Sequence, residues 1–194
     1  METQHLSLNT DKMSDFQQWK QINGDDFSLW DYLAGVSNIE VALAFTKVFL
    51  PDFVEHEGGI FLSEAFNLEI YEQWKAQLGD NIASIEQVMN HQHIDDLLPG
   101  SESAGIDNLF YLGQVIQQMW ENHLKSLYPK YSFEVSCTRD EYTVVVTFHH
   151  SNLQSSDKRY EEILSLGGQS VIIPKVKDSQ PKSKPRDRTS SSPH

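Results

Sequence analysis

The sequence predicts an α+β fold in which five or six helices pack against a small antiparallel sheet of two hairpins. Three observations predict this class. Apolar residues recur at spacings of three and four in several segments before residue 129, which is typical of amphipathic helices. Apolar and polar residues alternate instead over 131–149, which is typical of half-buried strands. A shorter apolar stretch, 53–63, surrounds a glycine pair, which favours a second hairpin.

Length and composition predict one domain. A chain of 194 residues is long enough to bury a core without a metal or a disulfide. We expect 1–173 to form a single α+β domain, in which 158–168 is a short helix and 170–173 a short edge strand. The segment 174–194 is rich in proline, serine and charge, and we expect it to be a disordered basic tail. Because Cys137 is the only cysteine, no intrachain disulfide can form, which favours a reducing cytosol.

The sequence also predicts a cytoplasmic protein that does not contact membranes. The first thirteen residues contain no apolar run behind a basic start, so we expect no secretory signal. The most apolar stretch, 41–50, has ten residues. A membrane span requires about 20 apolar residues, so this stretch is too short.

Two short helices are predicted near the N-terminus. The first covers 14–22, where Phe16 and Trp19 share a face, and it stops at an Asn-Gly pair. The second covers 25–35. It begins on aspartates, whose charge suits a helix N-terminus, and it ends on a glycine.

The third predicted helix, 39–50, is apolar almost all round. This pattern predicts a central buried helix. Ser37 and Glu40 have the spacing of a capping box at its start, and Pro51 ends it.

Three further helices are predicted before the long strands. The segment 67–79 has one apolar stripe and ends on Gly79, and 80–93 follows at once with Asp80 as its N-cap. These two should form an antiparallel pair. The segment 106–129 is the longest predicted helix. Its apolar stripe covers fewer than three heptads, which favours packing within its own domain over a dimer seam and leaves the oligomeric state open.

The two long strands, 131–137 and 142–149, are joined by a short loop that places Cys137 opposite Tyr142. One face of this hairpin then carries the large apolar residues Tyr131, Phe133, Val135, Cys137, Tyr142, Val144, Val146 and Phe148. The other face carries, besides Val145, the polar residues Ser132, Glu134, Ser136, Thr143, Thr147 and His149. We expect the polar face to be exposed to solvent and Cys137 to be a small core residue.

The shorter hairpin, 53–63, contains a Glu-His-Glu triplet that has the residue types of a reactive site. A two-residue loop made of the glycine pair would mix charged and aliphatic side chains on one face. A three-residue loop, 57–59, instead pairs His56 with Ile60 and puts a glycine in the left-handed position. This register separates Glu55 from the second glutamate and leaves His56 on an otherwise aliphatic face, which is typical of a partly buried histidine.

The candidate site residues lie in one short segment and on this hairpin. His91, His93 and Asp95 occur within five residues and are the candidate metal ligands. If the segment is helical, as predicted, His91 and His93 point about 200° apart and do not chelate together, whereas His91 and Asp95 share a face. His56, with Glu55, is the candidate for acid–base catalysis. These residues define an alternative function, a small enzyme or ligand-binding protein with a histidine and carboxylate site.

Other catalytic signatures do not occur in the sequence. No zinc, phosphate-binding or dinucleotide motif is present, so we expect no cofactor. The serine-containing segment 101–105 lacks the preceding strand that a nucleophile elbow requires. Tryptophan is enriched in binding hot spots, but helical spacing predicts core positions for all four: Trp19, Trp30, Trp74 and Trp120.

Charge is distributed unevenly and indicates the leading function. The segment 174–194 carries +4, whereas the rest of the chain carries −17, from 9 basic and 26 acidic residues. Such a domain repels phosphate backbones and attracts cationic partners, which argues against nucleic-acid binding. We therefore expect a non-enzymatic cytosolic interaction protein, such as an inhibitor or immunity-type protein that binds a basic partner.

Overall fold

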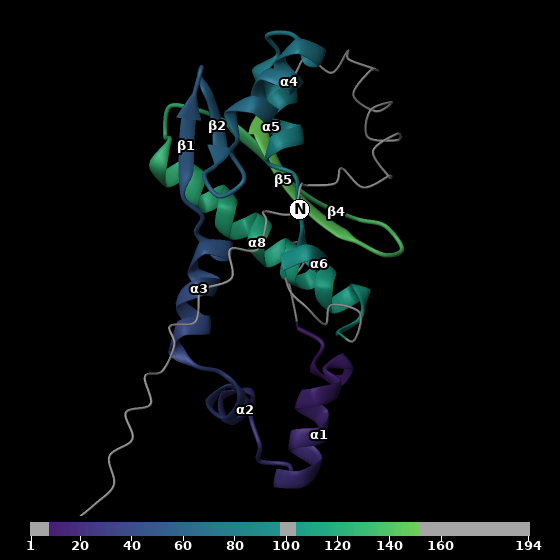
Figure 1. Cartoon of the computed structure of the whole chain (residues 1–194). Coiled ribbons are helices and arrows are strands. Elements are labelled where there is room, and N and C mark those ends of the chain that lie inside the picture. Colours follow the sequence, from purple (N-terminus) through teal and green to yellow (C-terminus); the bar gives the residue numbers. More distant parts are fainter. Residues whose placement is uncertain (1–7, 98–103, 152–194) are drawn as a thin grey trace, which may run out of the picture. The chain divides into compact units, whose positions relative to one another are not determined.

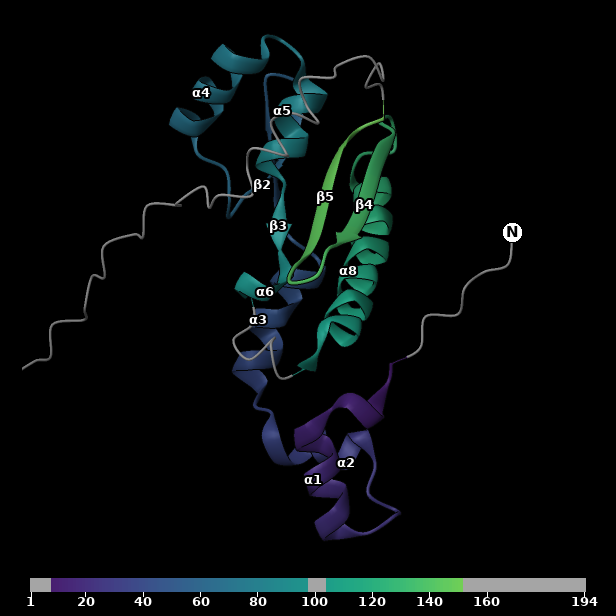
Figure 2. The same cartoon turned by 90° about the vertical axis from the view of Figure 1, so that its right-hand side faces the viewer.

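The computed structural model describes residues 8–97 and 104–151 and shows an α+β fold (Figures 1 and 2). Within these residues, seven α-helices pack against two small antiparallel sheets, one of two strands and one of three. The predicted fold class is confirmed, although the two predicted hairpins belong to separate sheets. The expected helix 158–168, edge strand 170–173 and basic tail 174–194 lie outside the described residues.

Short helices form the N-terminal part. After the 3-10 turn Thr10–Lys12 come α1 (Ser14–Asn23), α2 (Leu29–Val36) and α3 (Ile39–Phe49). As predicted, α1 stops at an Asn-Gly pair, where Gly24 adopts a φ of 99°. An aromatic cluster joins α1 to α2, with ring centroids 5.6 to 6.2 Å apart, and consists of Phe16, Trp19, Phe27 and Tyr32.

The caps of α2 and α3 differ from the predicted ones. A capping box starts α2, because the Ser28 hydroxyl accepts the N–H of Asp31 and the Asp31 carboxylate accepts the N–H of Ser28. The side chain of Asn38 caps α3 by accepting the N–H of Val41 at 2.9 Å. The capping box predicted at Ser37 is wrong, because the Ser37 hydroxyl donates to a carbonyl in the last turn of α2.

The first sheet is the hairpin of β1 (Phe53–His56) and β2 (Gly59–Leu62). Its loop has two residues, Glu57 and Gly58, with φ angles of 47° and 81°, as a type I′ turn requires. The predicted three-residue loop is therefore wrong, and each residue of β1 pairs one position earlier on β2. A non-glycine residue is uncommon in this left-handed region, and side-chain bonds to α4 hold Glu57 there.

The one-residue shift turns His56 toward an aromatic cluster. Its face of the hairpin also carries Phe61, which packs with Tyr71 in a small second core. The expectation of an aliphatic face around His56 is wrong for this reason. The opposite face carries Ile60 and Leu62. They belong to the main core, the larger of two clusters of buried apolar residues, which also contains Trp120, Val146 and Phe148.

Two helices follow the hairpin and contact each other: α4 (Leu68–Leu78) and α5 (Ile82–Met89). As predicted, α4 ends on Gly79. The N-cap of α5 is Asn81 instead of the predicted Asp80, and the helix ends four residues before the predicted end. Because α5 contacts both β2 and the central strand β5, it connects the two sheets.

The second sheet has the strand order β3-β5-β4, with β5 in the middle (Figure 2). It contains β3 (Gln92–His93), which leads into α6 (Ile94–Leu97), and the long hairpin of β4 (Phe133–Arg139) and β5 (Val144–His150). The longest helix, α8 (Ile106–Leu127), packs along β4 and β5.

The long hairpin pairs Cys137 with Val146, so the predicted pairing of Cys137 with Tyr142 is wrong. The Asp140 carboxylate shapes the turn by accepting the backbone N–H groups of Tyr142 and Thr143. Because the register differs by an even number of positions, the side chains within β4 and β5 keep their predicted faces. Tyr142, which was predicted on the apolar face, instead lies in the turn and is 79% exposed. As predicted, Cys137 packs against the main core, where burial raises the pKa of its thiol to about 11.

The polar face of this hairpin is covered on β5, contrary to the prediction. Here α5 packs on the sheet, and Thr147 and His149 are only 7% and 5% exposed. The Thr147 hydroxyl donates to the carbonyl of Gln87 in α5 at 2.9 Å. On β4, Glu134 is exposed. The expected solvent-exposed face is therefore found on β4 alone.

The central buried helix is α8 instead of α3. Ile116, Trp120 and Leu124 are at most 2% exposed, and they pack in the main core. Gly113 allows α8 to approach the sheet closely, because a Cβ at this position would lie 2.7 Å from a methyl carbon of Val144. This approach places α8 over the apolar face of β4 and β5.

No residue of α3 is buried, so the prediction of a central buried helix at 39–50 is wrong. The two sheets are already covered by α5 and α8, which leaves only the C-terminal end of α3 in contact with the main core, through Val48 and Phe49. The indole N–H of Trp120 donates to the Val48 carbonyl at 2.8 Å. Among the described helices, none alone is long and apolar enough to cross a membrane; α2 and α3 together have the length and composition, but a bend of 113° separates them.

Candidate functional site

Two histidines meet beyond the end of α5. The helix ends at Met89, and the chain continues in an extended conformation into β3. Residues two apart in an extended chain point to the same side. His91 and His93 therefore lie side by side, with their Nε2 atoms 3.1 Å apart and their ring centroids 4.8 Å apart. The prediction that these two rings point away from each other is wrong, because it assumed that the helix continues.

Asn90 anchors the chain where the helix ends. Its side chain is completely buried and accepts the N–H of Leu62 at 3.0 Å. It also donates to the carbonyls of Ile60 at 2.9 Å and Phe148 at 3.2 Å. Since these partners belong to β2 and β5, Asn90 fixes the chain between the two sheets just before the histidines begin.

A threonine and an aspartate determine which nitrogen of His93 carries the proton. The Thr143 hydroxyl donates to Asp95 Oδ1 at 2.5 Å and lies 2.9 Å from Nδ1 of His93. A hydroxyl has a single proton, so toward His93 the Thr143 oxygen can only accept. This pattern assigns the proton of a neutral His93 to Nδ1. The lone pair on Nε2 then faces His91.

The surroundings keep His91 neutral. Burial, with a smaller contribution from His93, lowers the pKa of His91 to about 4. Asp140 is a second carboxylate close to His93. Its pKa is lowered mainly by the backbone N–H groups of the turn and in smaller part by His93. Two imidazoles with facing nitrogens, beside carboxylates, can share a proton or, when both are neutral, bind a cation.

The loop of the short hairpin forms a second polar cluster with α4. Glu57 accepts the Tyr71 hydroxyl at 2.9 Å and pairs with Lys75, and these bonds, that of Lys75 first, lower the pKa of Glu57. Burial, together with the bond to Glu57, raises the pKa of Tyr71 to about 12. The ring of His56 lies 4.6 Å from that of Tyr71 and 5.3 Å from that of Phe66. Its Nε2 is buried and has no hydrogen-bond partner among the residues that the structure describes.

This second cluster is a weaker cation site than the paired histidines. His56, Glu57 and Glu72 each offer one ligand atom, and these atoms lie within 4.8 Å of one another. However, Glu57 is already paired with Lys75, whose positive charge would repel a cation. The candidate catalytic partner Glu55 is exposed and, as the strand neighbour of His56, lies on the other face of the hairpin. The structure does not bring Glu55 and His56 together.

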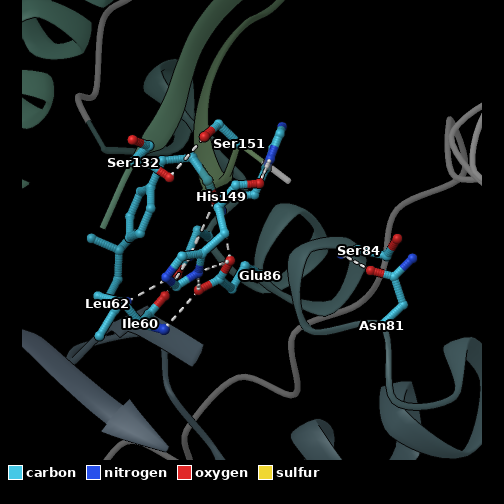
Figure 3. A network of polar contacts seen from close by, with 11 residues as sticks. Ile60, Leu62, Asn81, Ser84, Glu86, Ser132, His149 and Ser151 are labelled. Atoms are coloured by element: carbon cyan, nitrogen blue, oxygen red, sulfur yellow. Dashed lines mark hydrogen bonds and ion pairs between the residues drawn. The ribbon is translucent and has the colours of Figure 1, made fainter. Parts of the chain in front are cut away.

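A buried polar network connects the two sheets through α5 (Figure 3). The completely buried carboxylate of Glu86 accepts the backbone N–H groups of Ile60 and His150, both at 2.7 Å. It also pairs with Nδ1 of His150 at 2.7 Å. Because both oxygens are occupied by these groups, Glu86 is suited to hold β2 and β5 together and not to act on a substrate.

The sequence contains a signal for this network that its apolar stripes do not reveal. Glu86 and Asn90 are four residues apart and therefore lie on one face of α5, next to its apolar residues. Once such a pair is buried, as Glu86 and Asn90 are, each polar group requires hydrogen-bond partners on a neighbouring element.

Apolar side chains are exposed on the two consecutive helices α2 and α3. In the described part of the chain, seven of the fourteen exposed large hydrophobic residues fall between positions 30 and 50. We call them the α2–α3 apolar residues: Trp30 (81% exposed), Leu33, Val36, Ile39 (72%), Val41, Leu43 (60%) and Leu50. The predicted core position of Trp30 is wrong, whereas Trp120 is buried as predicted.

Comparison with known proteins gives no match: no protein-family model, curated protein sequence or solved structure matches this chain. The function is therefore inferred from the geometry and charge of the described residues.

Proposed function

We propose that this protein is a non-enzymatic interaction protein whose α2–α3 apolar residues bind a basic protein partner. One observation carries the proposal: half of the exposed large hydrophobic residues in the described chain lie in these two short helices or, for Leu50, at the C-cap of α3. Exposed apolar patches mark interaction surfaces in soluble proteins, and these seven residues all fall between positions 30 and 50.

The spacing of these residues suits a contact surface. Trp30, Leu33 and Val36 follow one another at intervals of three along α2, and Ile39 and Leu43 are four apart on α3. Side chains at these intervals share a helix face. Fully burying an exposed leucine or isoleucine side chain stabilises by at most about 1.5–3 kcal/mol, before the entropy cost of association. Tryptophan in such a surface is a common hot spot, which makes Trp30 the expected anchor.

Charge selects the kind of partner. The described residues contain 21 acidic and 7 basic residues, and five of these seven cations are already paired with carboxylates there. Between positions 25 and 50, the four acidic residues Asp25, Asp26, Asp31 and Glu40 outnumber the single basic residue Lys47, which is itself paired with Asp52. An acidic segment attracts a basic partner and repels a second copy of this acidic chain or an anionic membrane.

The test compares two double variants of the full chain. Leu33→Ser/Leu43→Ser removes apolar contacts from α2 and α3. Leu68→Ser/Leu127→Ser is the matched control, because these leucines are 54% and 52% exposed on other helices. The partner is isolated from the native cell on the immobilised wild-type chain, identified and purified, and its Kd is measured for each variant by calorimetry.

We expect Leu33→Ser/Leu43→Ser to weaken binding by about tenfold or more, and the control to leave it unchanged. We also expect Glu40→Lys to weaken binding and added salt to slow association. Equal affinity of both double variants overturns the proposal. The proposal is also overturned if sedimentation shows that only a second copy of the chain binds to the α2–α3 apolar residues. Binding of neutral lipid vesicles alone to these residues overturns it as well.

A further inference from the structure

We propose that His91 and His93 form the protein part of a binding site for a divalent transition-metal ion such as Zn²⁺, Ni²⁺ or Cu²⁺. These ions bind neutral imidazole readily, unlike Mg²⁺ and Ca²⁺, which select oxygen ligands. The site lies at β3 and does not involve the α2–α3 apolar residues.

The distance between the two histidines suits a shared metal. Zinc binds imidazole nitrogen at about 2.0–2.1 Å, so two nitrogens in neighbouring coordination positions lie about 2.9–3.4 Å apart, from octahedral to tetrahedral geometry. The observed separation of the Nε2 atoms is 3.1 Å. The extended segment 91–93, which leads into β3, therefore sets the spacing that a metal requires.

The protonation pattern also suits coordination. The Thr143 hydroxyl leaves His93 with its proton on Nδ1 and a free lone pair on Nε2. Without metal, His91 donates its Nε2 proton to that lone pair. On metal binding, this proton moves through solvent to Nδ1 of His91, so that both Nε2 lone pairs bind the ion and no net proton is released.

Thr143 and Asp95 act as positioning residues. A metal-bound histidine commonly donates its other N–H to an oxygen that fixes the ring, and loss of this contact weakens metal affinity roughly 10- to 100-fold. The Thr143 hydroxyl is this oxygen for His93, and Asp95 holds the hydroxyl in turn. The negative charges of Asp95 and Asp140 favour a cation nearby. With two protein nitrogens, the remaining coordination positions are open to water.

The experiment is a titration of the tag-free full chain with Zn²⁺ and Ni²⁺ by calorimetry, and with Cu²⁺ by electron paramagnetic resonance. We expect one ion per chain and, for Cu²⁺, a hyperfine pattern from two imidazole nitrogens. His91→Gln and His93→Gln should each weaken binding at least tenfold. Thr143→Val should weaken it about tenfold or more, and Thr143→Ser, which keeps the hydroxyl, should restore it.

Two controls locate the ion. His56→Gln removes the buried nitrogen of the hairpin cluster and should leave metal affinity unchanged, and so should Leu33→Ser/Leu43→Ser. No binding by the wild-type chain overturns the proposal. It is also overturned if His91→Gln/His93→Gln retains wild-type affinity, if the ion is lost with His56→Gln, or if bound Cu²⁺ shows no nitrogen pattern.

Discussion

The helices α2 and α3 on one side and α8 on the other differ in a way that their apolar content does not predict. In α3, eight of eleven residues are Ile, Val, Ala, Leu or Phe, yet none is buried. In α8, the residues between the apolar positions are largely polar, yet the helix supplies Ile116, Trp120 and Leu124 to the main core. A helix of this chain is buried where it covers the face of a sheet. High apolar content alone is not sufficient to bury it.

The physical difference lies in orientation. The apolar residues of α8 form a stripe, which directs one side of the helix to β4 and β5, and Gly113 allows close contact there. A helix that is apolar all round, such as α3, has no polar face that determines which of its sides packs on a sheet and which faces solvent. With both sheets already covered by other helices, α3 contributes only its C-terminal end, Val48 and Phe49, to the core.

The largest expected difference in stability is between the alanine variants of two tryptophans, Trp120 and Trp30. Trp120→Ala should destabilise the protein by about 3–5 kcal/mol, because it empties a buried position and removes the hydrogen bond to Val48. Trp30→Ala should change stability by less than about 0.5 kcal/mol, because that side chain is 81% exposed. Urea unfolding of both variants measures the two effects. A cost of several kcal/mol for Trp30→Ala would show that α2 is buried in the isolated chain.

The next effect tests the hydrogen bonds by which Glu86 joins β2 to β5. Glu86→Ala leaves the backbone N–H groups of Ile60 and His150 buried without an acceptor, so it should cost about 2–4 kcal/mol. Glu121→Ala is the control: Glu121 forms only an exposed pair with Lys125, worth about 0.3–0.5 kcal/mol. Equal midpoints of urea unfolding for the two variants would contradict the role assigned to Glu86.

Some parts of this fold were predictable from sequence because they depend on local pattern. The faces of β4 and β5 were predicted correctly despite a wrong register, since a shift of an even number of residues preserves the side on which each side chain lies. In the shorter hairpin the shift is one residue, and it moved His56 from an aliphatic to an aromatic environment. The Glu57–Gly58 turn that causes this shift depends on bonds from α4, which lies later in the chain.

The paired histidines illustrate what the sequence alone could not supply. His91 and His93 are two positions apart in the sequence. On a helix, such residues point in different directions and cannot share a site, whereas in an extended strand they point to the same side. Which of these applies depends on where α5 ends, and Asn90 at that point bonds to Ile60, Leu62 and Phe148. These partners are up to 58 residues away, so residue patterns around His91 and His93 do not contain the information.

A smaller effect compares two helical glycines in the two regions. Gly113→Ala places a Cβ 2.7 Å from Val144 and 2.8 Å from the sulfur of Cys137, and should cost about 1–2 kcal/mol despite the higher helix propensity of alanine. Gly35→Ala meets only the ring of Trp19, at 3.1 Å, which is partly exposed and can move. We expect it to be neutral or slightly stabilising. Thermal unfolding that ranks the two variants in the opposite order would contradict the close packing of α8.

The smallest effect concerns the exposed pair at the hairpin loop and depends on pH. Lys75 and Tyr71 lower the pKa of Glu57 in the folded protein below its unfolded value. The carboxylate therefore contributes stability above an unfolded pKa of about 4.3, and this contribution is lost as the pH falls through the folded pKa. Glu57→Gln should lower the Tm slightly at about pH 7, and the difference from wild type should disappear as the pH approaches about 3. Because glutamine does not titrate, a Tm difference that stays constant over this range would mean that packing of the left-handed turn, and not the charge of Glu57, stabilises the loop.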